Sequence, residues 1–111
     1  MTDLPLTSAR LESLGGGNFA IRGDLNFESA SFILEHSKQL FADHDQITVD
    51  MSGVLDADSA GLALLIEWLS WAKHYNRKIH YQQIPQRIAA IAEISEVNEL
   101  VKSDSASAKT N

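Results

Sequence analysis

Short alternating segments and longer helical patterns follow one another along the chain. Ala9–Leu14 alternates weakly between apolar and polar residues, as an edge strand does, and Phe19–Arg22 has the composition of a second strand. The run Gly15–Gly17 supplies the positive φ angles that a tight turn requires. The chain is therefore predicted to open with a β-hairpin, whose second strand is expected to end at Gly23 and Asp24.

After the hairpin, the pattern alternates between helix and strand. The predicted elements are a helix over Glu28–Ala42, a strand over Gln46–Met51, a loop over Ser52–Asp58, a helix from Ser59 to Tyr75, a strand over Lys78–Ile84 and a helix that begins at Pro85. Leu100-Val101 is predicted to be a last short strand or a helical turn. Residues 102–111 are small and polar, so we predict a disordered tail after a domain that spans residues 1–101.

This order, β-β-α-β-α-β-α, predicts an α/β fold. Strands that are joined through helices are expected to pair in parallel with right-handed crossovers, and the opening hairpin adds an antiparallel edge. The prediction is a small mixed β-sheet with helices packed on it.

The predicted helix over Ser59–Tyr75 is apolar around more of its circumference than a surface helix requires. At 100° per residue, one set falls within about 120° and suits packing on a sheet; its members are Leu62, Leu65, Ile66, Leu69 and Ala72. A second stripe consists of Leu64, Trp68, Trp71 and Tyr75. Two interpretations stay open: a neighbouring helix covers these aromatic residues, or Trp68, Trp71 or Tyr75 is partly exposed as an interaction surface.

The composition of the chain argues against several classes of function. The chain has 111 residues, 44% of them hydrophobic, which suits one folded domain. Its net charge of −6 argues against nucleic-acid binding, and the absence of cysteine excludes disulfides and thiol nucleophiles. The amino-terminal segment lacks the apolar core of a signal peptide, and the longest apolar run, Leu62–Ile66, is far below the ~20 residues of a membrane span. We therefore expect a cytoplasmic protein that reaches a membrane only through a partner, without inserting into it.

Ser59 opens the apolar helix and has carboxylates beside it. Serine is among the best residues for accepting hydrogen bonds from the unpaired N–H groups of a first helical turn, so Ser59 is predicted to be the N-cap. Asp56 and Asp58 go beyond what capping requires, although acids near a helix N-terminus are mildly favourable. A phosphate on Ser59 would feel both the helix dipole and these carboxylates, and would change the charge of any docking surface there.

Other chemistry finds little support in the residues. His74 lies on the same predicted helix as Ser59 but roughly 22 Å along it, too far to act as its base. The four histidines show no spacing typical of metal ligands. Asp50, Asp56 and Asp58 flank one predicted loop, where a solvated acidic loop is favoured over a magnesium site. We expect no metal and no cofactor.

Three segments carry a family resemblance. These are "IRGDLNFESA" (Ile21–Ala30), "ITVDMSGVLDADSAGLALLIEW" (Ile47–Trp68) and "PQRIAAIAEISEVNELV" (Pro85–Val101). Together they resemble a STAS domain, the fold shared by bacterial anti-sigma-factor antagonists and the cytoplasmic ends of sulphate transporters, over about residues 10–101. The resemblance implies a STAS-like (SpoIIAA-like) fold for the predicted sheet and helices. Its most specific parts are Gly23-Asp24-Leu25 and Asp58-Ser59-Ala60-Gly61.

Within that family, "SAGLALLIEWLSWAK" is most similar to the MlaB type, the small STAS subunit of a phospholipid-transport ABC complex in Gram-negative bacteria. This implies a non-enzymatic protein that binds and regulates the cytoplasmic ATPase subunit of that complex. Ser59 occupies the position of the family's hydroxyl that is phosphorylated or contacts a partner. The expected contact residues are Asp56, Asp58, Ser59, Ala60, Gly61, Ala63, Trp68 and Trp71.

The alternative that the resemblance leaves open is an anti-sigma-factor antagonist switched by phosphorylation of Ser59, with an anti-sigma factor or serine kinase as its partner. Antagonists usually carry an acid after the Gly-Asp-Leu motif, whereas this chain has Asn26. That departure favours the transport subunit.

Overall fold

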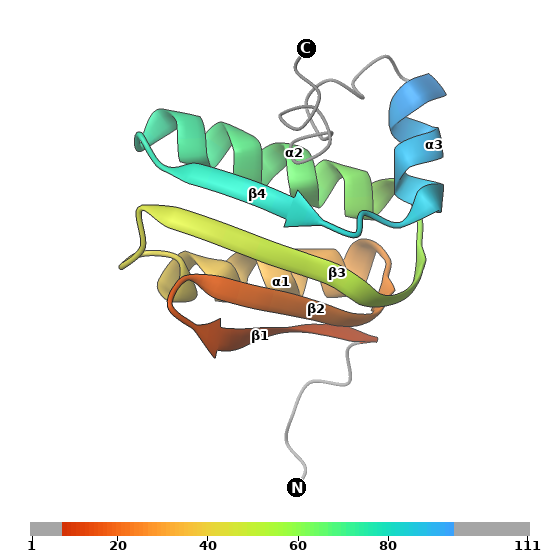
Figure 1. Cartoon of the computed structure of the whole chain (residues 1–111). Helices are drawn as coiled ribbons and strands as arrows, with labels where there is room; N and C mark the ends of the chain where they lie inside the picture. The colour runs from red at the N-terminus through yellow and green to blue at the C-terminus, as the bar shows by residue number, and fades with distance from the viewer. Residues whose placement is uncertain (1–7, 95–111) are drawn as a thin grey trace, which may run out of the picture.

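A four-stranded mixed sheet with two long helices on one face forms the body of the protein (Figure 1). The computed structural model describes residues 8–94. Its elements are β1 (Ala9–Gly15), β2 (Asn18–Leu25), α1 (Phe27–Leu40), β3 (Gln46–Ala57), α2 (Ser59–His74), β4 (Lys78–Gln82) and α3 (Gln86–Ile94). The predicted order β-β-α-β-α-β-α is confirmed.

The sheet has the strand order β1-β2-β3-β4. β1 pairs with β2 antiparallel, while β2 with β3 and β3 with β4 are parallel pairs. Phe19 of β2 lies opposite Val49 of β3, and Val49 in turn lies opposite Tyr81 of β4. The predicted mixed sheet with an antiparallel edge is therefore confirmed.

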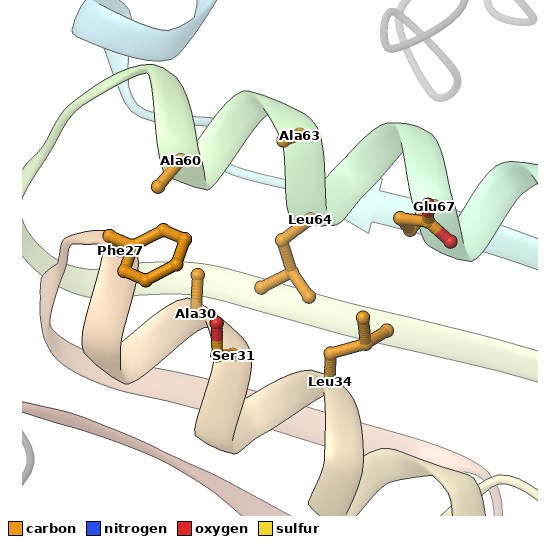
Figure 2. Close-up of a pocket in the computed structure, with 8 residues that line it drawn as sticks. All are labelled: Phe27, Ala30, Ser31, Leu34, Ala60, Ala63, Leu64 and Glu67. Carbon is orange, nitrogen blue, oxygen red and sulfur yellow. The ribbon is translucent and has the colours of Figure 1, made fainter.

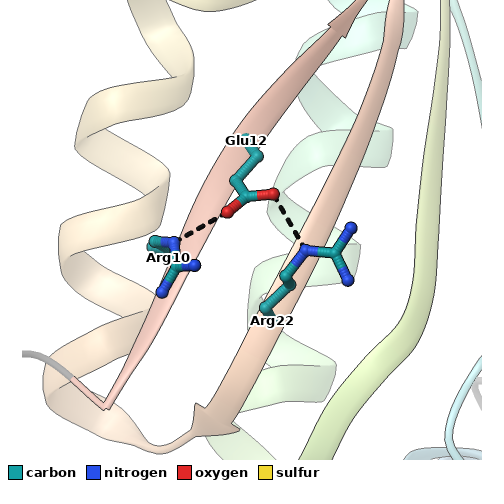
Figure 3. A network of polar contacts seen from close by, with 3 residues as sticks. All are labelled: Arg10, Glu12 and Arg22. Carbon is teal, nitrogen blue, oxygen red and sulfur yellow. Dashed lines mark hydrogen bonds and ion pairs between the residues drawn. The ribbon is translucent and has the colours of Figure 1, made fainter.

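The two faces of the sheet differ in polarity because side chains alternate along each strand. Toward α1 and α2 the strands present buried apolar residues that form the core, among them Leu11, Ile21, Ile47, Val49 and Ile79. The opposite face is polar, and on it Glu12 accepts hydrogen bonds from Nε of Arg22 and of Arg10, each at 2.8 Å (Figure 3). These bonds, that of Arg22 first, lower the pKa of the Glu12 carboxyl below its usual value.

The hairpin turn is built as predicted. Gly15, Gly16 and Gly17 all have positive φ angles, of 93°, 65° and 86°. At Gly17 a Cβ atom would lie 2.5 Å from the backbone oxygen of Gln46, so a side chain there would collide with the start of β3. Glycine at this position is required both by conformation and by space.

Two predicted strand ends are wrong. β2 runs through Gly23 and Asp24 to Leu25, and the segment predicted as a loop over Ser52–Asp58 is mostly the second half of β3. Gly23 has a φ of 108° and stands next to a register shift between β2 and β3. Glycine and small polar residues often end strands, but here they accommodate bulges in strands that continue.

The helix boundaries agree with the predictions to within two residues. α1 begins one residue earlier than predicted, because Asn26 is its N-cap and forms a capping box with Ser29: each side chain bonds the other's backbone N–H, both at 3.0 Å. The predicted last element at Leu100-Val101 and the predicted tail lie outside the described residues. Within residues 8–94, every helix is too short or too polar to cross a bilayer.

Candidate functional site

Asp58, and not Ser59, caps helix α2. Asp58 has extended backbone angles, and its Oδ1 accepts a hydrogen bond from the backbone N–H of Ala60 at 2.8 Å. Its own N–H donates to the carbonyl of Leu25 at 3.1 Å, which fixes it at the end of the sheet. The prediction of a Ser59 N-cap is therefore wrong: the carboxylate one residue earlier takes the capping role and also suits the positive end of the helix.

Ser59 consequently becomes the first helical residue, with its side chain in the solvent. It is exposed, and among the described residues its hydroxyl has no hydrogen-bond partner. Neither capping nor packing uses this oxygen. The expected outward position of the hydroxyl is observed.

Asp56 is tied to helix α3 at the same end of the sheet. Its Oδ1 accepts from the backbone N–H of Ala57 at 2.9 Å and lies 3.2 Å from Nη1 of Arg87. Both partners of this ion pair are about two-thirds exposed, so the pair orients the side chains and adds little stability. A shallow polar hollow lies here, lined by Asp24, Leu25, Asn26, Asp56, Ala57, Asp58 and Arg87. Within residues 8–94, no group of three histidine or acidic side chains is placed to hold a metal ion.

Gly61 is buried and serves packing. A Cβ atom there would lie 3.0 Å from Cδ1 of Ile88 and 3.4 Å from Cδ1 of Leu25, so glycine allows α3 to approach α2 closely. In this structure α3 covers Gly61, and its role as a contact residue stays a prediction. By contrast Ala63 is exposed and Ala60 is partly exposed.

The predicted exposure of Trp68 is wrong, because only 1% of its surface is accessible, and its contact with a partner stays a prediction. α1 runs beside α2 and covers it: Nε1 of Trp68 donates to Oγ of Ser37 at 2.9 Å, and its ring centroid lies 5.1 Å from that of Phe41. Of the two interpretations of the aromatic stripe, coverage by a neighbouring helix holds for Leu64 and Trp68.

The stripe becomes more exposed toward the end of α2. Trp71 is half-buried, with its ring 5.8 Å from that of Phe41 and 5.5 Å from the guanidinium carbon of Arg77. Tyr75 is 55% exposed. Arg77 itself is fixed by the connection between α1 and β3, because its Nη1 donates to the carbonyls of Phe41, Ala42 and His44 at 3.3, 2.9 and 2.7 Å.

Two large exposed apolar side chains were not predicted from the sequence. Phe27, the first residue of α1, is 78% exposed, and Leu55, near the end of β3, is 82% exposed. The position of Leu55 depends on the two register shifts between β2 and β3, which reset the alternation of the strand and give no signal in the sequence. Phe27 could have been noticed as an aromatic residue directly after an N-cap.

An apolar groove connects Phe27 with the start of α2 (Figure 2). It measures about 150 Å³ and is lined by Phe27, Ala30, Ser31, Leu34, Ala60, Ala63, Leu64 and Glu67. Two of the predicted contact residues, Ala60 and Ala63, thus belong to one wall of this groove. The site therefore consists of the exposed opening of α2 and the apolar groove that adjoins it.

Comparison with known proteins agrees with this architecture. The sequence profile of the family described as "Mlab, STAS domain" matches residues 13–102. Among solved structures, the anti-sigma factor antagonist SpoIIAA in its unphosphorylated form is similar, with a TM-score of 0.64, 13% sequence identity and 84% of each chain covered. At that identity the likeness establishes a shared fold. A search of curated proteins finds no match.

Proposed function

Because the chain belongs to the MlaB-type STAS domain family, we propose that it is a non-enzymatic subunit that binds the cytoplasmic ATPase of a phospholipid-transport ABC complex and regulates it. STAS domains are protein-interaction modules. In this proposal the protein lies at the cytoplasmic side of the inner membrane and is held there by the ATPase.

The observation that supports this proposal best is the combination of groups around Ser59. An exposed hydroxyl that the fold does not use opens α2, and the next residue, Ala60, lines an apolar groove together with Phe27, which is 78% exposed. Exposed apolar residues that gather near polar groups are typical of protein-interaction sites. Both neighbouring carboxylates, Asp56 and Asp58, are already engaged by the fold, through Arg87 and the α2 N-terminus.

Ser59 would lie inside the contact, where a small neutral side chain can be covered without a large desolvation cost. A charged group at this position would have to lose its hydration when the partner binds. It would also follow directly after Asp58 and three residues after Asp56, which adds like-charge repulsion. Binding should therefore tolerate a second hydroxyl residue and resist a carboxylate.

The test measures the affinity of the purified protein for the purified ATPase subunit of the phospholipid transporter from the same genome, by titration calorimetry. Ser59→Glu should weaken binding about tenfold or more, as truncation or charge changes at interface centres do. Ser59→Thr should stay close to the parent. Ser13→Glu makes the same change at an exposed serine of β1 and is the matched control. An unchanged Kd for Ser59→Glu would place the contact elsewhere.

A second function is favoured by the accessibility of the same hydroxyl. Because Ser59 neither caps α2 nor packs, a kinase could reach it without opening the fold, as a phosphorylation-switched anti-sigma-factor antagonist requires. Incubation with the serine kinase encoded beside a sigma factor, followed by intact-protein mass spectrometry, separates the two functions. Stoichiometric addition of one phosphate, lost in Ser59→Ala, supports the switch, whereas no addition supports the transport subunit.

A further inference from the structure

We infer that the groove between α1 and α2 receives an amphipathic helix of the partner, with apolar anchor residues flanked by lysine or arginine. This inference rests on the proposed function, because it takes the partner to be the transporter ATPase. It adds the chemistry of the partner segment and the residues that select it.

The first part of the groove is lined mainly by apolar side chains, which suits the binding of an apolar side chain. Figure 2 shows Leu34 of α1 and Leu64 of α2 pointing toward each other across it, with the Phe27 ring at the end near Ala60. A cavity of about 150 Å³ accommodates a group the size of a benzene ring. One large anchor side chain of a partner therefore fits here.

A second hollow continues along the same pair of helices. It measures about 140 Å³ and is lined by Leu34, Ser37, Lys38, Phe41, Glu67, Trp68 and Trp71. Leu34 and Glu67 line both hollows, so the two are consecutive parts of one groove. Two anchor sites in a row along an apolar groove suit an amphipathic helix, whose anchors recur every three or four residues.

The charges at the Phe27 end of the groove favour a basic occupant, whereas the far end has Arg77 against the Trp71 ring. Glu67 lines both hollows, and Glu28 is the residue next to Phe27 in the first turn of α1. In the two hollows Lys38 is the one positive side chain, and its ammonium lies 3.5 Å from the carboxylate of Glu35, which offsets it. Complementary charge speeds association and excludes wrong partners. A second copy of this chain would present the same acidic rim to itself, so the groove suits a different protein.

Cross-linking identifies the occupant directly. The chain has no cysteine, so Ala63→Cys introduces a single attachment point for a maleimide-linked photo-cross-linker in the groove. The labelled protein is irradiated with the purified ATPase, and the joined peptide is sequenced by mass spectrometry. Ala42→Cys, at an exposed site in the loop after α1, is the control. We expect a peptide from a helix with apolar residues at three- or four-residue spacing and flanking Lys or Arg. A peptide without that pattern, or a cross-link to a second copy, overturns the inference.

Charge reversal provides an independent measurement. Glu67→Lys should weaken ATPase binding about tenfold and make it less sensitive to salt, because an attractive charge near the contact is replaced by a repulsive one. Glu93→Lys, which changes an exposed glutamate on α3, should alter the Kd by less than about twofold. Equal losses in both variants would mean that net charge alone matters, and would overturn the inference.

These results separate the inference from the proposed function. If Ser59→Glu weakens binding while Ala63→Phe, which fills the groove, and Glu67→Lys do not, the groove inference fails and the ATPase-binding function stands. If the unaltered protein does not bind the ATPase, the proposed function itself fails. Circular dichroism of each variant establishes that the fold is retained.

Discussion

The two halves of helix α2 serve different purposes. In its opening turn, Ser59–Ala63, the exposed side chains make no contact that the fold depends on, and the hydroxyl of Ser59 is accessible. In its later part, Leu65–His74, side chains and backbone are bonded to other elements: Trp68 to Ser37, and the Leu65 carbonyl to the hydroxyl of Tyr81 at 2.6 Å. The same helix thus combines a surface available to a partner with a segment that holds the domain together.

This difference separates binding from stability along one helix. Changes at the exposed positions of the opening turn should affect partner affinity with little change in the free energy of unfolding. Changes at the buried positions of the later part should lower stability and affect binding only by reducing the folded fraction, whereas the exposed Glu67 belongs to the groove. The buried Gly61 and Leu62 are the exceptions in the opening turn, because α3 packs on Gly61 and Leu62 belongs to the core. The following predictions test this division, beginning with the largest effect.

Trp68→Ala should lower the free energy of unfolding by about 3–5 kcal/mol, because it empties a fully buried site and removes the indole hydrogen bond to Ser37. Urea denaturation followed by circular dichroism measures the change. Ser59→Ala on the same helix is the control and should shift stability by less than about 0.5 kcal/mol. Comparable losses in the two variants would end the distinction between the halves.

Arg77→Ala should cost about 1.5–3 kcal/mol, since one guanidinium nitrogen donates to three backbone carbonyls of the α1–β3 connection. It would also remove the cation–π contact with Trp71. Lys78→Ala, an exposed neighbour, is the control and should be nearly neutral. Differential scanning calorimetry compares their Tm values. A Tm for Arg77→Ala equal to that of the control would show that the hydrogen bonds of Arg77 to the α1–β3 connection add no stability.

Alkaline pH should destabilise the protein through Tyr81. Burial raises the pKa of its hydroxyl well above the usual value near 10. A pKa raised in the folded state means that the contribution to stability is complete below the unfolded value and is lost as the pH rises toward the folded one. Urea midpoints measured from pH 8 to pH 11 should therefore fall at the alkaline end. Tyr81→Phe should reduce that fall, and Tyr75→Phe, at an exposed tyrosine, should leave it in place.

Asp58→Ala should lower stability by about 1 kcal/mol, the usual contribution of an N-cap side chain. The adjacent change Ser59→Ala should be nearly neutral. This pair of variants, compared by urea denaturation, tests which residue caps α2. A larger loss of stability for Ser59→Ala than for Asp58→Ala would show that Ser59 is the N-cap. Its hydroxyl would then have a role in the fold and would not support a partner site.

The order of elements was predictable because each apolar run has one clear period. β1, β4 and α2 have the predicted positions to within two residues, since turn residues bound them on both sides. The second half of β3 was not predictable. The pairing with β2 contains bulges and places Asp56 and Ala57 in the sheet. The segment that includes Asp50, Gly53, Asp56 and Asp58 nevertheless has the composition of a loop.

The start of α2 was predicted in position, whereas the roles of several residues around it were not. The pattern Asp58-Ser59-Ala60-Gly61 located the opening of α2, yet the roles of Asp58 and Gly61, and that of Trp68 further along the helix, depend on tertiary contacts. Asp58 caps because Leu25 fixes its backbone, Gly61 is covered by α3, and Trp68 is covered by α1. The groove beside Ser59 belongs to two helices that are distant in sequence, so no local pattern could reveal it.

The long β3 strand has a consequence for how this protein can vary. Since Leu25 pairs with Ala57 immediately before the helix, the orientation of α2 is set by residue count along the strand. Adding or removing one residue between Ser52 and Ala57 would reverse which strand side chains point inward. It would also rotate the start of α2, so that Ser59 would no longer face its present side of the molecule. Length changes among homologous chains should therefore collect at the glycine hairpin or after α1, and this short segment should keep a constant number of residues.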